Sequence, residues 1–152
     1  MSQTIITMSK SIVPTISSGT AGPLGVLHLP RLWQKASLGA AGKLHSDYPA
    51  CGQGYDQMVL SALGLDRDAF LAFIATKPTY VQTEAWVKAN ATQLNDSAVA
   101  ELNAAIKGYI HADDTRKAIL AAVGLTDDGS ILDAVNLNNL DDWNSFHAQD
   151  IA

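Results

Sequence analysis

From the end of the first fifth of the chain, helix start and stop signals follow one another so closely that they leave little room for strands. Thr79 and Gln82 have the spacing of a capping box, in which each side chain satisfies a backbone N–H at the start of a helix. Asp66 and Asn95 are candidate N-cap residues before two helical patterns. Gly64 follows another helical pattern, where a glycine in the left-handed conformation commonly ends a helix. No convincing run of strict apolar alternation interrupts these patterns. The sequence therefore predicts an all-α fold.

The periodic segments predict a single compact bundle of about six or seven short helices. The segments are about Pro30 to Ala41, Tyr55 to Gly64, the stretches that follow Asp66, Thr79 and Asn95, Asp114 to Val123, and a last one with Leu140, Trp143 and His147 on one stripe. The fifth segment has an apolar face that we expect to be buried: Val99, Leu102, Ile106, Tyr109 and Ile110. On the last helix we expect His147 to be a half-buried packing residue.

The N-terminal segment has a different character. Residues 1–27 are rich in Ser, Thr and Gly and contain Pro14 and Pro23, so they present no periodic face. We expect an extended N-terminal arm there, either packed on the body or mobile. We expect residues 28–152 to be a single helical domain, because a chain of 152 residues that is 47% apolar suits one domain with a sizeable core.

The charge balance argues against nucleic acid as a partner. The formal net charge is -5, and residues 112–152 contain eight Asp against two basic residues. Such a surface repels a phosphate backbone. Because the excess negative charge lies near the C-terminus, we expect an anion to bind within the first two thirds of the chain.

Neither a membrane nor a secretory route is predicted. No window is long and apolar enough to span a membrane, and the N-terminus lacks the unbroken apolar run of a secretory signal. The one cysteine cannot form an internal disulfide, which fits either a reducing compartment or a fold that needs no disulfide. We therefore predict a cytoplasmic protein without a membrane partner, and leave open whether it forms a homo-oligomer.

The densest polar stretch, residues 45–56, follows the first predicted helix. His45 is a candidate general base near neutral pH, oriented by Asp47 or Asp56. Tyr48 and Tyr55 are candidate donors to a developing oxyanion. The helix that begins after Gly54 also offers unpaired N–H groups that favour an anion. A solvent-facing or structural role for the histidine is the simpler interpretation, as is a dipole-stabilising role for Asp56.

Two like charges occupy one face of the first helix. Arg31 and Lys35 are four residues apart, where they repel unless a carboxylate or a ligand anion lies between them. One interpretation is a structural ion pair with Asp47 or Asp56. The other is that the two cations bind an anionic substrate.

Cys51 is either a pocket-lining or nucleophilic thiol or a small buried residue, and the latter is the commoner case. A metal site is a further alternative. The available donors are His45, Asp47, Cys51 and Asp56, with His111 and Asp113 or His147 and Asp150 as additions. Their spacing matches no strong zinc pattern, and the usual hydrolase and nucleotide-binding motifs are absent from the sequence.

Several short motifs carry a family resemblance. They are Leu29-Pro30-Arg31-Leu32-Trp33-Gln34-Lys35-Ala36, Gly42-Lys43-Leu44-His45, Cys51, Asp56, Gly64-Leu65-Asp66, Phe70-Leu71, Glu84, Trp86-Val87, Asn103-Ala104 and Asp141-Asp142-Trp143. In order and spacing the chain resembles, from about residue 23 to 151, a bacterial family of domains of unknown function, number 5069. The resemblance implies a small, mainly helical domain and points to Arg31, Lys35, Cys51 and Asp56, but it implies no activity. The chain departs from the family pattern at Ala50-Cys51-Gly52, where the family tends to have Cys followed by Pro.

These features lead to a functional hypothesis. We expect a small enzyme that uses acid–base chemistry, of the lyase or isomerase type, on an anionic organic metabolite and needs no external cofactor. Arg31 and Lys35 would bind the anion, while His45 with Asp47 or Asp56 would move protons. The alternatives are a non-catalytic helical interaction or ligand-binding protein, and a metal-dependent enzyme or sensor that uses the loop around His45.

Overall fold

The computed structural model describes residues 10–152, and its regular elements are all helices. They are α1 (Leu29–Ala40), α2 (Tyr55–Leu63), α3 (Arg67–Ile74), α4 (Tyr80–Asn90), α5 (Asp96–Gly108), α6 (Asp113–Ala122) and α7 (Ala134–Asp150). Within residues 10–152 the only β-type pairings are isolated bridges. The predicted all-α bundle of about six or seven short helices is therefore confirmed, with each predicted helix present.

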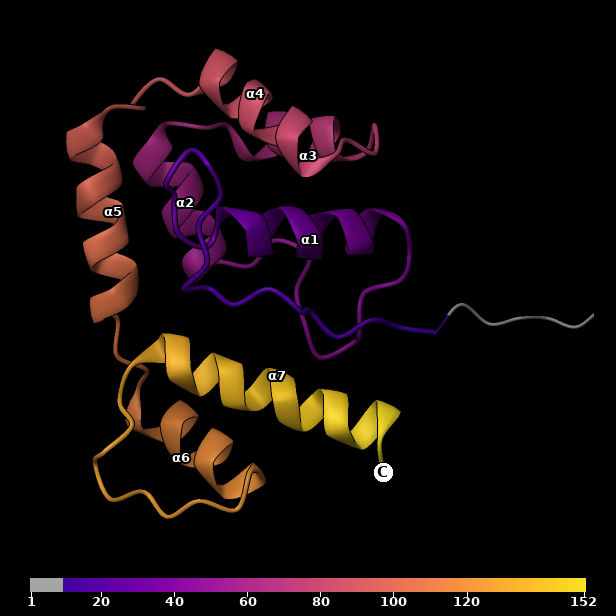
Figure 1. Ribbon diagram of the computed structural model, residues 1–152, viewed down its shortest axis with the longest axis vertical. Coiled ribbons are helices and arrows are strands. Elements are labelled where there is room, and N and C mark those ends of the chain that lie inside the picture. Colours follow the sequence, from indigo (N-terminus) through magenta and orange to yellow (C-terminus); the bar gives the residue numbers. More distant parts are fainter. Residues whose placement is uncertain (1–9) are drawn as a thin grey trace, which may run out of the picture.

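The helices form two groups that α5 connects (Figure 1). Helices α3 and α4 lie on one side of α1, and α6 and α7 lie on the other side. Helix α5 runs along the edge of the molecule and packs against α2 in one group and against α7 in the other. No helix among residues 10–152 has the length and hydropathy that crossing a membrane requires.

The predicted end signals act where the sequence places them. Thr79 and Gln82 form the complete capping box at the start of α4, and the Asp66 and Asn95 side chains accept backbone N–H bonds at the starts of α3 and α5. Gly64 ends α2 with φ 65°. A Cβ at Gly64 would also collide with the Thr92 side chain, so this position requires glycine for two reasons.

The core lies between α1, α2, α3 and α5. Its fully buried members include Leu29, Leu32, Leu60, Leu63, Phe70, Ile74 and Ile106. These residues recur three or four apart on their helices, so each helix buries one face against the others. The core holds α1 rigidly, and α1 carries two of the cations discussed below.

Two burial predictions are partly wrong. Leu102 and Ile106 are buried as expected, but α5 ends at Gly108, which leaves Tyr109 and Ile110 44% and 56% exposed. On α7, His147 is exposed and not half-buried, because the helix turns Leu137 and not the predicted stripe toward the body.

The described part of the predicted N-terminal arm, residues 10–27, contains no helix and lies against the body. Val13, Ser18 and Val26 are buried, and Gln34 on α1 receives two backbone N–H bonds from Thr15 and Ile16. Residues 1–9 of the predicted arm lie outside the described residues. The described segment thus acts as a strap that covers one side of α1.

Candidate functional site

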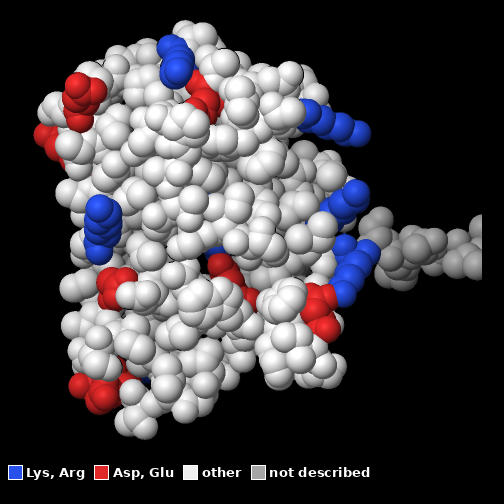
Figure 2. All heavy atoms as spheres, in the orientation of Figure 1, with Lys and Arg blue, Asp and Glu red and all other residues white. Residues whose placement is uncertain are grey.

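A cavity of about 310 Å³ opens between the two helix groups. Its walls come from α1, the loop 47–54, the start of α2, the segment after α5, and α7. Figure 2 shows a hollow near the centre of the face, where acidic and basic atoms meet at a level between α1 and α7. The volume is at the small end of the range for ligand pockets, which suits a metabolite.

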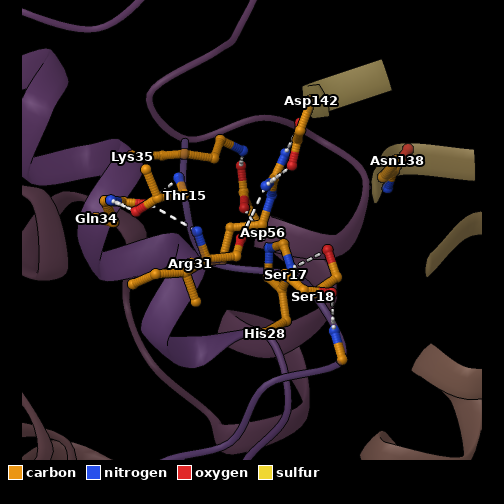
Figure 3. A network of polar contacts seen from close by, with 12 residues as sticks. Thr15, Ser17, Ser18, His28, Arg31, Gln34, Lys35, Asp56, Asn138 and Asp142 are labelled. Carbon is orange, nitrogen blue, oxygen red and sulfur yellow. Dashed lines mark hydrogen bonds and ion pairs between the residues drawn. The ribbon is translucent and has the colours of Figure 1, made fainter. Parts of the chain in front are cut away.

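A buried ionic network forms the deep side of the cavity. The Lys35 Nζ lies 2.6 Å from Asp56 Oδ2, and the His28 Nε2 lies 2.6 Å from Asp56 Oδ1. Arg31 donates two bonds to Asp142 on α7, of 2.6 and 3.0 Å. Figure 3 shows these side chains converging from α1, α2 and α7, with Asn138 apart from them.

Asp56 is the centre of this network. It is 3% exposed in the first turn of α2, and its Oδ2 also accepts the Gly52 N–H at 2.7 Å. Burial alone would raise the pKa of the Asp56 carboxyl, but the hydrogen bond from His28 and the charge of Lys35 outweigh it and hold the pKa well below its usual 3.8. Asp56 is therefore an ionised group that positions its neighbours.

His28 was not among the predicted site residues. It precedes α1 in a left-handed conformation with φ 70°, which is unusual for a residue other than glycine. Its Nδ1 is 2.9 Å from the Ser18 hydroxyl in the strap. Burial lowers the pKa of His28, so the imidazole is neutral; we assign the tautomer in which Nε2–H donates to Asp56 and Nδ1 accepts from Ser18.

Serine, histidine and aspartate thus form a continuous chain, as in many hydrolases, but the arrangement differs in access. Ser18 is 1% exposed and does not line the cavity. Its hydroxyl has no route to a substrate, so this chain of hydrogen bonds fastens the strap to the body. The contact between Ser18 and His28 is therefore structural, although His28 itself lines the cavity.

Arg31 joins three parts of the molecule. Besides its fork on Asp142, it donates to the Ile16 carbonyl of the strap at 2.9 Å. Its guanidinium lies 5.8 Å from the centre of the Tyr48 ring, within the range of a cation–π contact. The Tyr48 hydroxyl is buried and has no hydrogen-bond partner among residues 10–152.

The N-terminus of α2 opens into the same cavity. Its N-cap residue, Gly54, provides no side-chain cap, and both Gly54 and Tyr55 line the cavity. The first N–H groups of a helix have no intrahelical partners and carry the positive end of the helix dipole. An anion in the cavity would therefore meet partial positive charge from the backbone.

A row of aromatic rings forms one wall of the cavity. Between ring centres, Tyr55 lies 5.3 Å from His28 and 5.5 Å from Tyr109. The ring centres of Tyr109 and His111 are 5.9 Å apart. Tyr55 also donates to the Ile106 carbonyl at 2.6 Å, and burial raises the pKa of Tyr55 to about 12. The wall thus offers ring faces and not phenolate charge.

Helix α7 also lines the cavity, through Ala134, Asn138 and Asp141, which recur at helical spacing. Asn138 Oδ1 lies 2.9 Å from His111 Nε2. The Asp141 carboxylate has no hydrogen bond or ion pair within the part of the chain that the structure describes. Burial, and then the charges of Asp142 and Asp47, raise the pKa of Asp141.

The structure brings together six of the eight predicted site residues. Arg31, Lys35, Asp47, Tyr48, Tyr55 and Asp56 all line the cavity. The predicted ion pair for one of the two cations exists between Lys35 and Asp56, whereas the partner of Arg31 is Asp142, which was not foreseen.

The other two predicted residues, His45 and Cys51, do not line the cavity. His45 accepts the Asp47 N–H at 3.1 Å and packs edge-on against the Tyr48 ring. Cys51 is a half-buried free thiol, and burial raises its pKa. Arg67 donates to the Cys51 carbonyl, so this part of the loop has a structural anchor.

Sequence reasoning missed most of the residues that reach the cavity from elsewhere in the chain: His28, Tyr109, Asn138, Asp141 and the network partner Asp142. It considered His111 only as an additional metal donor. Only His28 left a local signal, as a polar residue within the apolar run Val26-Leu27-His28-Leu29. The contribution of α7 also means that the cavity is not confined to the first two thirds of the chain. For a metal, no group of three or more His, Cys, Asp or Glu side chains among residues 10–152 is placed to hold an ion.

A family model, described as a domain of unknown function (DUF5069), matches residues 16–143. Every residue that lines the cavity falls within this range. The chain has no match among curated proteins.

Proposed function

The chain belongs to the DUF5069 family, and for this member we propose that the cavity binds a small organic anion and performs acid–base chemistry on it, of the lyase or isomerase type. The single observation that carries the proposal is that the uncapped N-terminus of α2 opens into the same cavity as two buried cations, Lys35 and Arg31. Each feature alone attracts an anion weakly, and their convergence favours a defined position for one.

The carboxylate of Asp56 does not cancel this preference. His28 and Gly52 donate to it, and Lys35 pairs with it, so its charge is already balanced. Lys35 has three N–H donors, of which one is engaged with Asp56. The remaining donors are available to a ligand, because Lys35 lines the cavity.

The proton-transfer part of the proposal depends on different residues from those expected. His45 lies outside the cavity, and the low pKa of Asp56 makes it a poor proton carrier. His111 lines the cavity, and imidazole is the side chain that most often serves as a general acid or base in enzymes. We therefore assign the acid–base role to His111, with Arg31, Lys35 and the α2 N-terminus holding the anion and Asp56 as a positioning residue.

Binding is tested by isothermal titration calorimetry with butyrate and with inorganic phosphate. In Gly54→Asp a carboxylate would cap the free N–H groups of α2 and repel a ligand, whereas Gly54→Ala adds only a methyl group, which meets no atom within 4 Å. The expected result is a loss of affinity of at least about tenfold in Gly54→Asp and of less than about threefold in Gly54→Ala. Equal affinity of both variants would contradict the anion site.

A non-catalytic ligand-binding protein is the second candidate, because the network fixes the most perturbed carboxyl, Asp56, in one state. The two candidates differ in proton exchange. Incubation of the protein with small carboxylates in heavy water is expected to exchange a carbon-bound hydrogen next to the carboxylate, and His111→Gln should slow this exchange while the exposed-residue variant His147→Asn should not. Binding without exchange would favour the non-catalytic candidate.

A further inference from the structure

The charges in the cavity do not balance, and the imbalance indicates what else the ligand carries. Arg31 is paired with Asp142 and Lys35 with Asp56, so these four groups contribute no net charge. Asp47 and Asp141 also line the cavity and add two negative charges. A ligand that is only an anion would leave these two carboxylates without a counter-charge.

Asp141 is the more informative of the two. Asp47 is 76% exposed in its side chain and can be solvated, whereas Asp141 is half-buried and has no hydrogen bond or ion pair among residues 10–152. Leaving a carboxylate in that position costs free energy, which a cation beside it would offset. The raised pKa of Asp141 is consistent with this cost.

The surroundings of Asp141 suit an organic ammonium group. Tyr55 and Tyr109 present aromatic rings to the same cavity, and ring faces attract organic cations. Asn138 adds a side-chain amide one helical turn before Asp141. A metal ion would require a denser set of donors than the described residues provide.

We propose that the ligand is a small amino acid or a related zwitterion, whose carboxylate lies at the α2 N-terminus beside Lys35 and whose ammonium group lies against Asp141 on α7. This inference rests on the proposed anion site and adds a second, cationic end to it. Because α2 and α7 belong to different helix groups, such a ligand would bridge the two groups across the cavity.

The test compares matched four-carbon probes by calorimetry: butyrate, α-aminobutyrate, γ-aminobutyrate and butylamine. At least one amino acid is expected to bind about tenfold more tightly than butyrate, and butylamine more weakly than that amino acid. Asp141→Asn should remove the gain from the ammonium group and leave butyrate affinity within about twofold. Asp96→Asn, an exposed acid at the start of α5 with the same change of charge, should leave the gain intact.

The outcomes separate this inference from the proposed function. If butyrate binds and neither amino acid binds more tightly, the inference is wrong and the anion site stands. If no carboxylate binds, the anion site itself is wrong. Equal effects of Asp141→Asn and Asp96→Asn would also overturn the inference, because they would indicate overall charge and not a local contact. Folding of each variant is checked by its Tm, which we expect to rise in Asp141→Asn as an unpaired carboxylate is removed.

Discussion

The Lys35 ammonium lies 2.6 Å from the Asp56 carboxylate, and the two side chains are 7% and 3% exposed. The pair is thus withdrawn from water at the deep side of the cavity. A buried ion pair adds little over well-packed apolar groups, but removal of one partner leaves the other as an unpaired buried charge. The pair therefore makes the fold and the site depend on the same contact.

Lys35→Met is expected to lower the free energy of unfolding by about 3–5 kcal/mol, because it leaves Asp56 without its main counter-charge. Urea denaturation measures this change. Lys43→Met is the matched control, since Lys43 is exposed, and it should change stability by less than about 0.5 kcal/mol. Similar losses in the two variants would contradict the role of the pair.

The neutral state of His28 predicts an acid-sensitive fold. Its pKa in the folded state lies below 6.5, so under mildly acidic conditions the unfolded chain binds a proton that the folded chain does not. Stability should therefore fall as the pH drops below about 6.5, by up to about 1.4 kcal/mol per pH unit. Asp56 contributes a separate loss, confined to pH values near and below its usual 3.8.

Urea denaturation at several pH values between about 5 and 7.5 measures this dependence. In His28→Asn the pH dependence near 6.5 should be largely absent, although the variant is less stable overall. Asparagine is chosen because it tolerates the left-handed backbone at this position. An unchanged pH dependence in His28→Asn would assign it to other groups.

The strap should loosen when Ser18 loses its hydroxyl. Ser18→Ala leaves the buried His28 Nδ1 without a donor, at a cost of about 1–3 kcal/mol. Ser17→Ala is the control, because the Ser17 hydroxyl accepts only the exposed Gly19 N–H in the same strap. Hydrogen exchange of the strap amides, compared with those of α3, should accelerate in Ser18→Ala alone.

Gly39 allows the loop of the candidate site to lie close to α1. A Cβ at Gly39 would be 2.5 Å from the Ala50 Cβ, so Gly39→Ala should destabilise the protein although alanine usually favours a helix. Ala50→Gly in the same chain should restore stability. Gly108→Ala on α5 meets no atom within 4 Å and should stabilise by up to about 1 kcal/mol. Thermal denaturation of the four proteins checks the difference in sign.

The local features of this fold were predictable, because each depends on residues close together in sequence. Capping at Thr79 and the left-handed end at Gly64 require only a few neighbouring side chains, and both were identified correctly. The position of the polar loop before α2 is local in the same sense. The exposure of Tyr109 was missed because α5 ends at Gly108, so that the last two residues of the expected face, Tyr109 and Ile110, lie beyond the helix.

The candidate site was only half predictable, because its walls come from opposite ends of the chain. Arg31 and Lys35 signalled a need for carboxylates, but their repulsion does not say which acids satisfy it. The pairing of Arg31 with Asp142 depends on the packing of α7 against α5, which brings Asp142 to α1. No local sequence pattern encodes this packing. Asp141 and His111 reach the cavity by the same route.

Amide chemical shifts test the central claim most directly. A titration of the ¹⁵N-labelled protein with butyrate reports on each backbone N–H, including the free groups of Tyr55, Asp56 and Gln57 at the start of α2. If the cavity binds anions there, these three amides shift together along one saturable curve, and the shifts disappear in Gly54→Asp. Amides of α2 that do not move, or shifts concentrated at exposed lysines elsewhere, would contradict the claim.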